Sequence, residues 1–292
     1  YTLWHTLSLH DALPILAFVP GLRAVSINGR VRRLARAPRV HNGRLSLPRE
    51  IASLLPERLR TARVRGTVVL DPGHGGRDAG AVANGVKEKD LVLDVARRAA
   101  RRLRAAGATV ILTRDSDRFV SLSERSRIAN RTPGAVFVSI HANALSRRTR
   151  HWRSVHGVET FVLARRISES YRVRKASREY DVEQATPRGV ETLTPAEERA
   201  AIAELSRDAR AGSLALARAV QDELVGQTGD TDRKVKQMNL AVLRETYFGP
   251  AVLTEIGFLT HGPTAAKMKT PGFRDRAAQA IADGVAAFLR ER

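Results

Sequence analysis

The sequence predicts an α/β fold whose mostly parallel or mixed sheet of about six strands is flanked by helices, with a small β-rich N-terminal segment. From residue 65 onward, apolar runs of strand length alternate with segments whose apolar residues recur every three or four positions. Before residue 65, two Asn-Gly pairs separate short alternating segments, which indicates hairpins. The 292 residues, 43% of them hydrophobic, suffice for a large domain and a small one.

Residues 1–15 do not resemble protein sequence. The stretch TLSLHDALPI at 6–15 reads back without a break into ACT CTT TCC CTA CAC GAC GCT CTT CCG ATC, which is similar to a sequencing adapter. We therefore expect residues 1–15 to be an assembly artefact. The alternative is a truncated signal peptide, because LPILAFVPGLRA is apolar and ends in a small residue. Either way, no export signal can be read.

Residues 16–64 are predicted to form a small β-rich accessory module. Asn28-Gly29 and Asn42-Gly43 predict hairpin turns, since both residue types tolerate positive φ, and Leu47-Pro48 opens a short amphipathic helix. The stretch resembles a short β repeat found at the N-terminus of copper amine oxidases and in bacterial wall enzymes. It carries no metal-ligand pattern.

Residues 65–292 are predicted to form one catalytic domain. Apolar runs predict strands, and periodic apolar positions predict helices, the longest of which begins at a capping box that opens with Thr194 and Pro195. Residues 165–193 are charged and aperiodic, which predicts a loop or mobile insertion, counted as 165–210 with the start of that helix. The expected strands are 66–71, 108–114, 135–143, 157–163, 240–244 and 250–258, and the other helices 88–106, 121–131 and 273–290.

Composition narrows the classes of partner. The formal net charge of +20 favours an anionic partner, such as nucleic acid, anionic lipid or an acidic wall polymer. Nucleic acid is disfavoured because aromatic residues, at 5%, hardly interleave with the basic ones. The absence of cysteine excludes thiolate nucleophiles and cysteine-ligated zinc, and no apolar run is long enough to predict a membrane span.

Two histidines follow or end buried strands. His74 lies in DPGHGG, which matches neither a dinucleotide fingerprint nor a Walker loop. Two interpretations of His74 remain: a residue of an ordinary turn, or a metal ligand. His141 likewise lies near the carboxyl end of a predicted strand, in FVSIHAN. Ligands bind at the carboxyl ends of strands in open α/β sheets, although a single histidine there is often a hydrogen-bonded core residue.

Two glutamates complete the candidate site. Glu88 opens a predicted helix, where it either balances the helix dipole or joins His74 and His141 as a third zinc ligand. Glu255 lies in the apolar strand PAVLTEIGF, and an ionisable residue there is costly unless it is paired or catalytic. It would take a proton from the attacking water and deliver it to the leaving amine. The alternative is an edge-strand glutamate that faces solvent.

Several motifs in order, including VVLDPGHGGRDAGA, KEKDLVLDVA, FVSIHAN, GVETF and PAVLTEIGFLT, resemble the zinc-dependent N-acetylmuramoyl-L-alanine amidases. The resemblance covers residues 66–289. It implies one Zn²⁺ per chain, held by His74, Glu88 and His141, with Glu255 as the catalytic glutamate. It also implies hydrolysis of the amide between N-acetylmuramic acid and L-alanine in peptidoglycan. His151 and His156 are interpreted as surface residues.

The resemblance also implies a location and partners. We expect a periplasmic, secreted or wall-bound enzyme that acts on peptidoglycan, with no nucleic acid and no membrane span. A further hypothesis is that part of 165–210 covers the zinc cleft, with Glu197 or Glu198 at the open metal position, until an activator protein displaces it. The alternatives are a zinc amidase or carboxypeptidase for another peptide, and a basic protein that only binds an anionic polymer.

Overall fold

The computed structural model describes residues 64–132, 134–164 and 195–291, together with Arg172, Lys175, Ala176 and short strands elsewhere. The chain divides into two compact units, residues 1–63 and 64–292. Among the described helices, none combines the length and apolar character that crossing a membrane requires.

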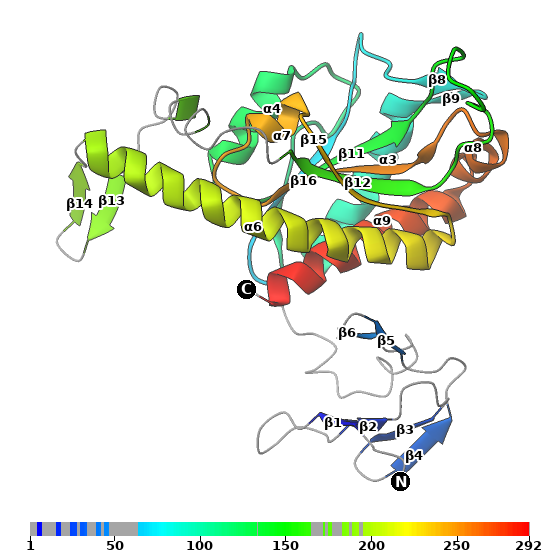
Figure 1. Ribbon diagram of the computed structural model, residues 1–292, viewed down its shortest axis with the longest axis horizontal. Helices are drawn as coiled ribbons and strands as arrows, with labels where there is room; N and C mark the ends of the chain where they lie inside the picture. The colour runs from blue at the N-terminus through cyan, green and yellow to red at the C-terminus, as the bar shows by residue number, and fades with distance from the viewer. Residues whose placement is uncertain are drawn as a thin grey trace. The chain divides into compact units, whose positions relative to one another are not determined.

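The described part of the first unit consists of short antiparallel strands (Figure 1). The strands on either side of Asn28-Gly29 pair with each other, as do those on either side of Asn42-Gly43, which confirms both predicted hairpins. The helix expected after Leu47 lies outside the described residues, and the assignments of 1–15 and 16–64 stay predictions. The strands are β1 (His5–Leu7), β2 (Leu16–Phe18), β3 (Ala24–Ile27), β4 (Arg30–Arg33), β5 (Arg39–His41) and β6 (Arg44–Ser46).

A six-stranded mixed sheet organises the second unit, which confirms the predicted fold class. Its order is β10 (Thr109–Leu112), β7 (Thr67–Pro72), β11 (Val136–Asn143), β16 (Ala251–Phe258), β12 (Val158–Leu163) and β15 (Asp232–Met238). The first four strands are parallel, β12 is antiparallel to β16, and β15 is parallel to β12.

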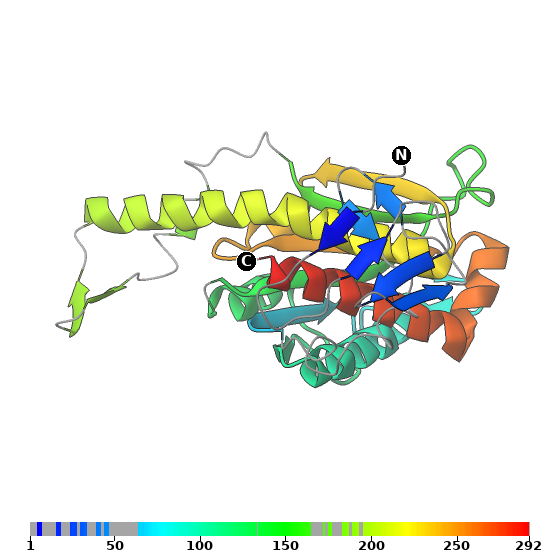
Figure 2. The same ribbon diagram turned by 90° about the horizontal axis from the view of Figure 1, so that it is seen from below.

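Helices cover both faces of this sheet because alternate side chains of each strand point to opposite faces. Val68, Val138 and Val252 pack on one face in a core shared with α3 (Glu88–Ala105), α6 (Pro195–Thr228) and α9 (Pro271–Arg290). These three helices lie side by side in Figure 2. Val69, Phe137 and Leu253 pack on the other face with the shorter α4 (Leu122–Asn130) and α7 (Ala241–Arg244). A further helix, α8 (Gly262–Lys269), follows β16.

One predicted strand is wrong. Residues 240–244 form the helical turn α7, with Val242 and Leu243 buried, and the sixth strand is β15 instead. A run of four apolar residues has no readable period, so its pattern cannot distinguish a strand from a buried helical turn. The charged segment of β15 can form a strand because it lies at the edge of the sheet.

Two hairpins were not expected. In the insertion, predicted to be a loop, β13 (Glu183–Thr186) pairs with β14 (Gly189–Thr192). The strands β8 (Val82–Ala83) and β9 (Val86–Lys87) pair around Asn84 and Gly85, whose φ angles are 48° and 72°. This Asn-Gly pair is the same hairpin signal that identified the turns of the first unit.

A buried ion pair lies at the end of β7. Asp71 is fully buried, and its Oδ1 accepts hydrogen bonds from Arg125 Nη1 and Thr113 Oγ1, both at 2.5 Å. Its Oδ2 accepts one from Ser139 Oγ on β11 at 2.7 Å. Because every bond of this carboxylate reaches a different element, Asp71 joins β7 to β11, to the segment after β10 and to α4.

Replacing Asp71 with alanine is expected to lower the free energy of unfolding by about 3–5 kcal/mol, because Arg125 then stays buried without a counter-charge. Urea unfolding measures this difference. The control is Arg127→Gln, which removes an exposed pair with Glu124 and is expected to cost less than about 1 kcal/mol. A loss for Asp71→Ala no larger than the control's would show that the pair is dispensable.

Candidate metal centre

The turn after β7 brings His74 to the carboxyl end of the sheet. His74 has a φ of 59°, a left-handed conformation that costs energy in a residue with a side chain. Gly73 donates its N–H to the carbonyl oxygen of Ile140 at 3.0 Å, which ties the turn to β11. A Cβ at Gly73 would lie 2.3 Å from the His141 ring, so glycine is required for the two histidines to approach.

Two buried arginines hold this turn by its carbonyl oxygens. Arg114 donates to Pro72 at 2.9 Å and to Gly73 at 2.7 Å, and Arg125 donates to Pro72 at 2.8 Å and to His74 at 2.7 Å. Burial, and then repulsion from Arg125, lower the pKa of Arg114 to about 10, so it stays charged at neutral pH. The strained backbone at His74 is therefore fixed by charge-assisted hydrogen bonds.

His74, Glu88 and His141 converge at this edge, as the sequence predicts. Glu88 begins α3, and its carboxylate bridges the imidazoles, with Oε1 2.9 Å from His141 Nδ1 and Oε2 3.2 Å from His74 Nε2. One ligand atom from each residue lies within 4.8 Å of the other two. The ring centroids are 5.0 Å apart, at an interplanar angle of 80°. This group of two nitrogens and a carboxylate could hold a metal ion.

Backbone groups fix the Glu88 carboxylate. Ala81 donates its N–H to Oε2 at 2.8 Å, and Ala142 donates to Oε1 at 3.1 Å. A Cβ at Gly80 would lie 2.6 Å from Oε2, so the backbone just before β8 also packs closely against the Glu88 carboxylate. With these bonds in place, the cluster is preorganised to receive a cation.

The ionisation of the cluster suits a cation. Burial by itself raises the pKa of Glu88, but the hydrogen bonds to His141 and His74 outweigh it and hold that pKa well below its ordinary value. Burial likewise opposes protonation of His74, and the hydrogen bonds to Glu88 and Asp78 outweigh it and raise the pKa of His74. The positive charge that protonation places on His74 is one that a metal ion could supply instead.

Asp78 orients His74. Its Oδ2 lies 2.8 Å from His74 Nδ1, which turns Nε2 toward Glu88, and its Oδ1 accepts the N–H of Gly80 at 3.0 Å. Carboxylates commonly hold the second nitrogen of a metal-ligating histidine in this way. Sequence reasoning missed Asp78, although its place four residues after His74 on a glycine-rich turn was a usable signal.

Glu255 lies next to His141 in the sheet. On the face that carries α4 and α7, the register pairs His141 of β11 with Glu255 of β16, and Glu255 with Glu159 of β12. Register partners on one face have Cβ atoms about 4.5–5.5 Å apart, so these three side chains form a row across three strands. The prediction that Glu255 points to the same rim as the histidines therefore agrees with the register.

One oxygen of the Glu255 carboxyl, the buried Oε2, has no hydrogen-bond partner within the described part of the chain. Burial, followed by repulsion from Glu88 and Glu159, raises the pKa of Glu255 well above its ordinary value. Glu159, by contrast, accepts from Asn143 Nδ2 and Arg233 Nε, each at 2.9 Å, and pairs with Lys236. Sequence reasoning missed Glu159, although it is also an acid inside an apolar strand.

The two histidines interpreted as surface residues take no part in the cluster. His151 is exposed, and His156 is half-buried, with its ring stacked on that of His261 at 4.6 Å between centroids. The only group of possible metal ligands in the part of the chain that the structure describes is His74, Glu88 and His141.

The described residues of α6 lie away from this cluster, and the lid hypothesis stays a prediction because most of residues 165–194 lies outside the described part of the chain. Arg210 of α6 donates to the carbonyl of Ala164, and Ser213 accepts the N–H of Ala251, the first residue of β16. Glu255 lies four residues further along β16, about 13 Å away. In Figures 1 and 2, the first half of α6 extends past the end of the sheet that is remote from α8. Glu197 is exposed there, and the side chain of Glu198 lies outside the described residues.

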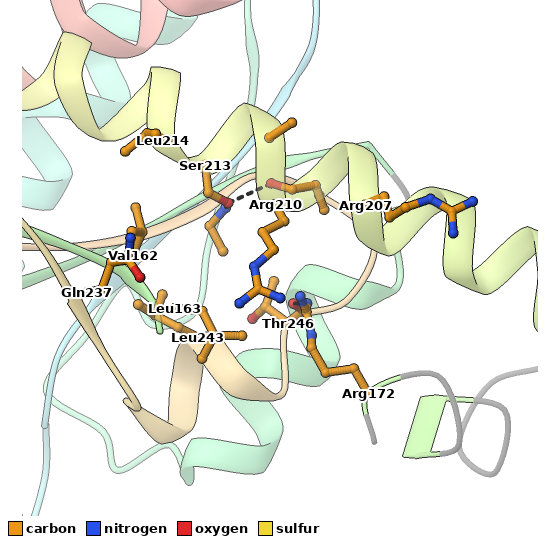
Figure 3. Close-up of a pocket in the computed structure, with 14 residues that line it drawn as sticks. Val162, Leu163, Arg172, Arg207, Arg210, Ser213, Leu214, Gln237, Leu243 and Thr246 are labelled. Atoms are coloured by element: carbon orange, nitrogen blue, oxygen red, sulfur yellow. Dashed lines mark hydrogen bonds between the residues drawn. The ribbon is translucent and has the colours of Figure 1, made fainter. Parts of the chain in front are cut away.

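A cavity of about 460 Å³ also lies at that remote end (Figure 3). Apolar residues of β12, α6 and α7 form much of it, and Arg210 points into it from α6. The cavity shares no residue with the metal cluster, so the candidate site is the smaller, polar edge and not this pocket.

The fold and the histidine–glutamate cluster define the class of this protein. Residues 68–287 match the model of the Amidase_3 family, N-acetylmuramoyl-L-alanine amidase, and the chain belongs to that family.

Particular relatives agree with this class. The chain is 31% identical over 240 residues to N-acetylmuramoyl-L-alanine amidase LytC of Bacillus subtilis (strain 168), a match that covers 82% of this chain and 39% of LytC. It is 30% identical over 224 residues to AmiA of Escherichia coli (strain K12), covering 76% and 75%. The catalytic domain of CwlV from Bacillus (Paenibacillus) polymyxa var. colistinus superposes with a TM-score of 0.57 at 28% identity, covering 78% of this chain and 99% of that domain.

Replacing Asp78 with alanine is expected to weaken Zn²⁺ binding by about 10–100-fold, because His74 loses the partner that orients it. Competition with a chelating dye measures the affinity. The matched control is Asp117→Ala, which also removes a carboxylate that accepts an N–H of this turn, at Gly76, but does not touch His74. Equal affinities for the Asp78 variant and the unaltered chain would contradict the orienting role.

Proposed function

We propose that this chain is a zinc-dependent hydrolase of the amide bond between N-acetylmuramic acid and L-alanine in peptidoglycan, serving wall remodelling or daughter-cell separation. The observation that carries the proposal is the convergence of His74, Glu88 and His141 beside a carboxyl, Glu255, that has an unpartnered oxygen. Membership of the amidase family supports the reaction. The chain spans 39% of the length of LytC and 55% of AmiC of Neisseria meningitidis, so its substrate and partners are proposals.

Zinc fits the donor set. Catalytic zinc sites commonly use three protein ligands of imidazole and carboxylate type and leave one position open. His74, Glu88 and His141 supply such a set, and Asp78 supplies the outer partner that a zinc-ligating histidine requires. Bound there, zinc would supply Lewis-acid chemistry that polarises a carbonyl and lowers the pKa of water.

Glu255 is the proton carrier in this proposal. In its ionised form it takes a proton from the attacking water, and in its protonated form it gives that proton to the leaving amine of L-alanine. The raised pKa of Glu255 favours its protonated form more than in an ordinary glutamate, as a group that must deliver a proton requires. Among the described residues no donor contacts the buried Oε2, so no protein group competes for that oxygen.

Location and regulation follow as finer proposals. A peptidoglycan hydrolase acts outside the cytoplasmic membrane, in the periplasm or the wall. An activator protein that acts on residues 165–210 stays part of the proposal. In that proposal the activator displaces part of 165–210 from the metal centre, while α6 itself stays attached to the sheet through Arg210 and Ser213.

Two alternative functions can be compared with the same observations. A zinc amidase or carboxypeptidase for another peptide would share the cluster and Glu255 but release different products. A basic polymer-binding protein would bind through the net charge of +20 alone, and the histidine–glutamate cluster and Glu255 would have no role. The cluster and the unpartnered Glu255 oxygen favour an enzyme over the binding protein.

Removing the metal with a chelator is expected to abolish digestion of purified sacculi, and added Zn²⁺ is expected to restore it, because the proposed reaction depends on the ion. Mass spectrometry of the products should show free L-alanine amino termini and intact muramic acid lactyl groups. Cleavage at another bond would favour the second function, and full activity of metal-free protein, verified by elemental analysis, would rule out the zinc mechanism.

Replacing Glu255 with glutamine is expected to reduce turnover by about 10²-fold or more while zinc stays bound, because the amide keeps the size of the side chain but cannot carry the proton. Steady-state hydrolysis of sacculi and the zinc content are the two measurements. Loss of zinc from this variant would instead make Glu255 a ligand. The control His156→Gln should change neither quantity, since His156 lies outside the cluster.

A further inference from the structure

The loop between β11 and β12 carries a concentrated positive charge at the edge of the sheet where the metal cluster lies. Between residues 144 and 158 there are four arginines, Arg147, Arg148, Arg150 and Arg153, and no acidic residue. All four are exposed. We propose that these arginines, called here the arginine rim, bind carboxylates on the peptide stems of peptidoglycan and so position the substrate; this inference rests on the proposed function.

The arginine rim differs from other basic residues of the same unit. Arg98 pairs with Asp94 at 3.0 Å, and Arg102 pairs with Asp275 at 2.6 Å. Among the described residues, by contrast, the four guanidiniums of the rim contact no carboxylate, and the interaction found is the stacking of Arg153 over the Trp152 ring at 4.6 Å. Like charges this close repel one another, and an anionic ligand would remove that cost.

Hydrogen bonds fold the backbone of the loop into successive turns, from which the four arginines extend. Successive turns are closed by hydrogen bonds from Thr149 N to Ser146 O at 2.9 Å, from Trp152 N to Thr149 O at 3.2 Å, and from Ser154 N to His151 O at 2.9 Å. A preorganised loop loses less conformational entropy when it binds a ligand than a flexible one does.

The base of the loop is attached beside the catalytic strand. Leu145 donates its N–H to Thr260 Oγ1 at 3.4 Å, and His156 stacks on His261, so both ends of the loop contact the segment that follows β16. In Figures 1 and 2, the loop projects from the same end of the sheet as α8. The arginine rim therefore borders the edge that holds His141 and Glu255.

Distance favours the peptide part of the substrate as the ligand. Arg147 is six residues after His141, so their Cα atoms are at most about 20 Å apart. An extended peptide of three to five residues reaches about 10–17 Å from the bond to be cut. The peptide stems carry carboxylates within that reach, whereas the sugars next to the bond offer no comparable charge for a guanidinium.

The test compares binding of two charge-matched variants to sacculi stripped of phosphate-bearing polymers. One variant carries R147Q, R148Q, R150Q and R153Q; the control carries R101Q, R131Q, R199Q and R218Q, four exposed arginines outside the loop. Both carry Glu255→Gln so that the wall is not digested, and equal thermal unfolding midpoints verify folding. Cosedimentation is expected to show a Kd at least about tenfold higher for the rim variant than for the unaltered loop, and a change below about threefold for the control.

A second arm identifies the ligand. Sacculi whose carboxylates have been converted to neutral amides are expected to bind the unaltered loop as weakly as native sacculi bind the rim variant. Unchanged binding of the rim variant, or equal losses in both variants, would overturn the proposal. Tight binding to amidated sacculi, or binding that requires the phosphate polymers, would overturn the carboxylate assignment. Product analysis of digested sacculi tests the proposed function separately, since failure to cleave leaves these binding results valid.

Discussion

Two buried guanidiniums, those of Arg114 and Arg125, make the rest of the site possible. They hold the carbonyl oxygens of residues 72–74, and Asp71 balances the charge of Arg125. His74 adopts a left-handed backbone that a loose turn would relax. Since Gly73 lies against the His141 ring, any relaxation of the turn would also change the distance between the imidazoles. The distance between the two imidazoles of the candidate metal site thus depends on the hydrogen bonds that Arg114 and Arg125 donate to the buried turn.

Around this turn, two glutamates experience opposite environments. Burial raises the pKa of both, but hydrogen bonds to His141 and His74 reverse the effect at Glu88, whereas repulsion from Glu88 and Glu159 adds to it at Glu255. A carboxylate with a low pKa is a permanent anion suited to a cation, and one with a raised pKa can hold and release a proton. The neighbours of these two identical side chains therefore shift their pKa values in opposite directions.

Sequence reasoning proposed candidate residues that could be recognised from their position relative to apolar runs. His74 and His141 follow or lie near the ends of apolar runs, and parallel strands bring such ends to one edge, whereas Glu255 is an acid inside an apolar strand. Position within a run does not reveal which polar side chains will touch, so Asp78 and the row that includes Glu159 emerged only from the turn and the register. The error at 240–244 has another cause: burial of Val242 and Leu243 fixes their apolar character but leaves helix and strand equally possible.

The remote end of the sheet is still connected to the site through α6. This helix of 34 residues begins at the insertion and continues to Gln221 and beyond. Gln221 donates to the backbone carbonyl of Val158 at 2.9 Å and accepts from the side-chain hydroxyl of Thr160 at 2.9 Å, so it contacts the residues on both sides of Glu159. Glu159 in turn is the register partner of Glu255. The contacts of α6 with β12 thus end at the strand whose Glu159 helps to raise the pKa of Glu255. Packed contacts thus connect α6, which begins in the insertion, to the strand next to Glu255.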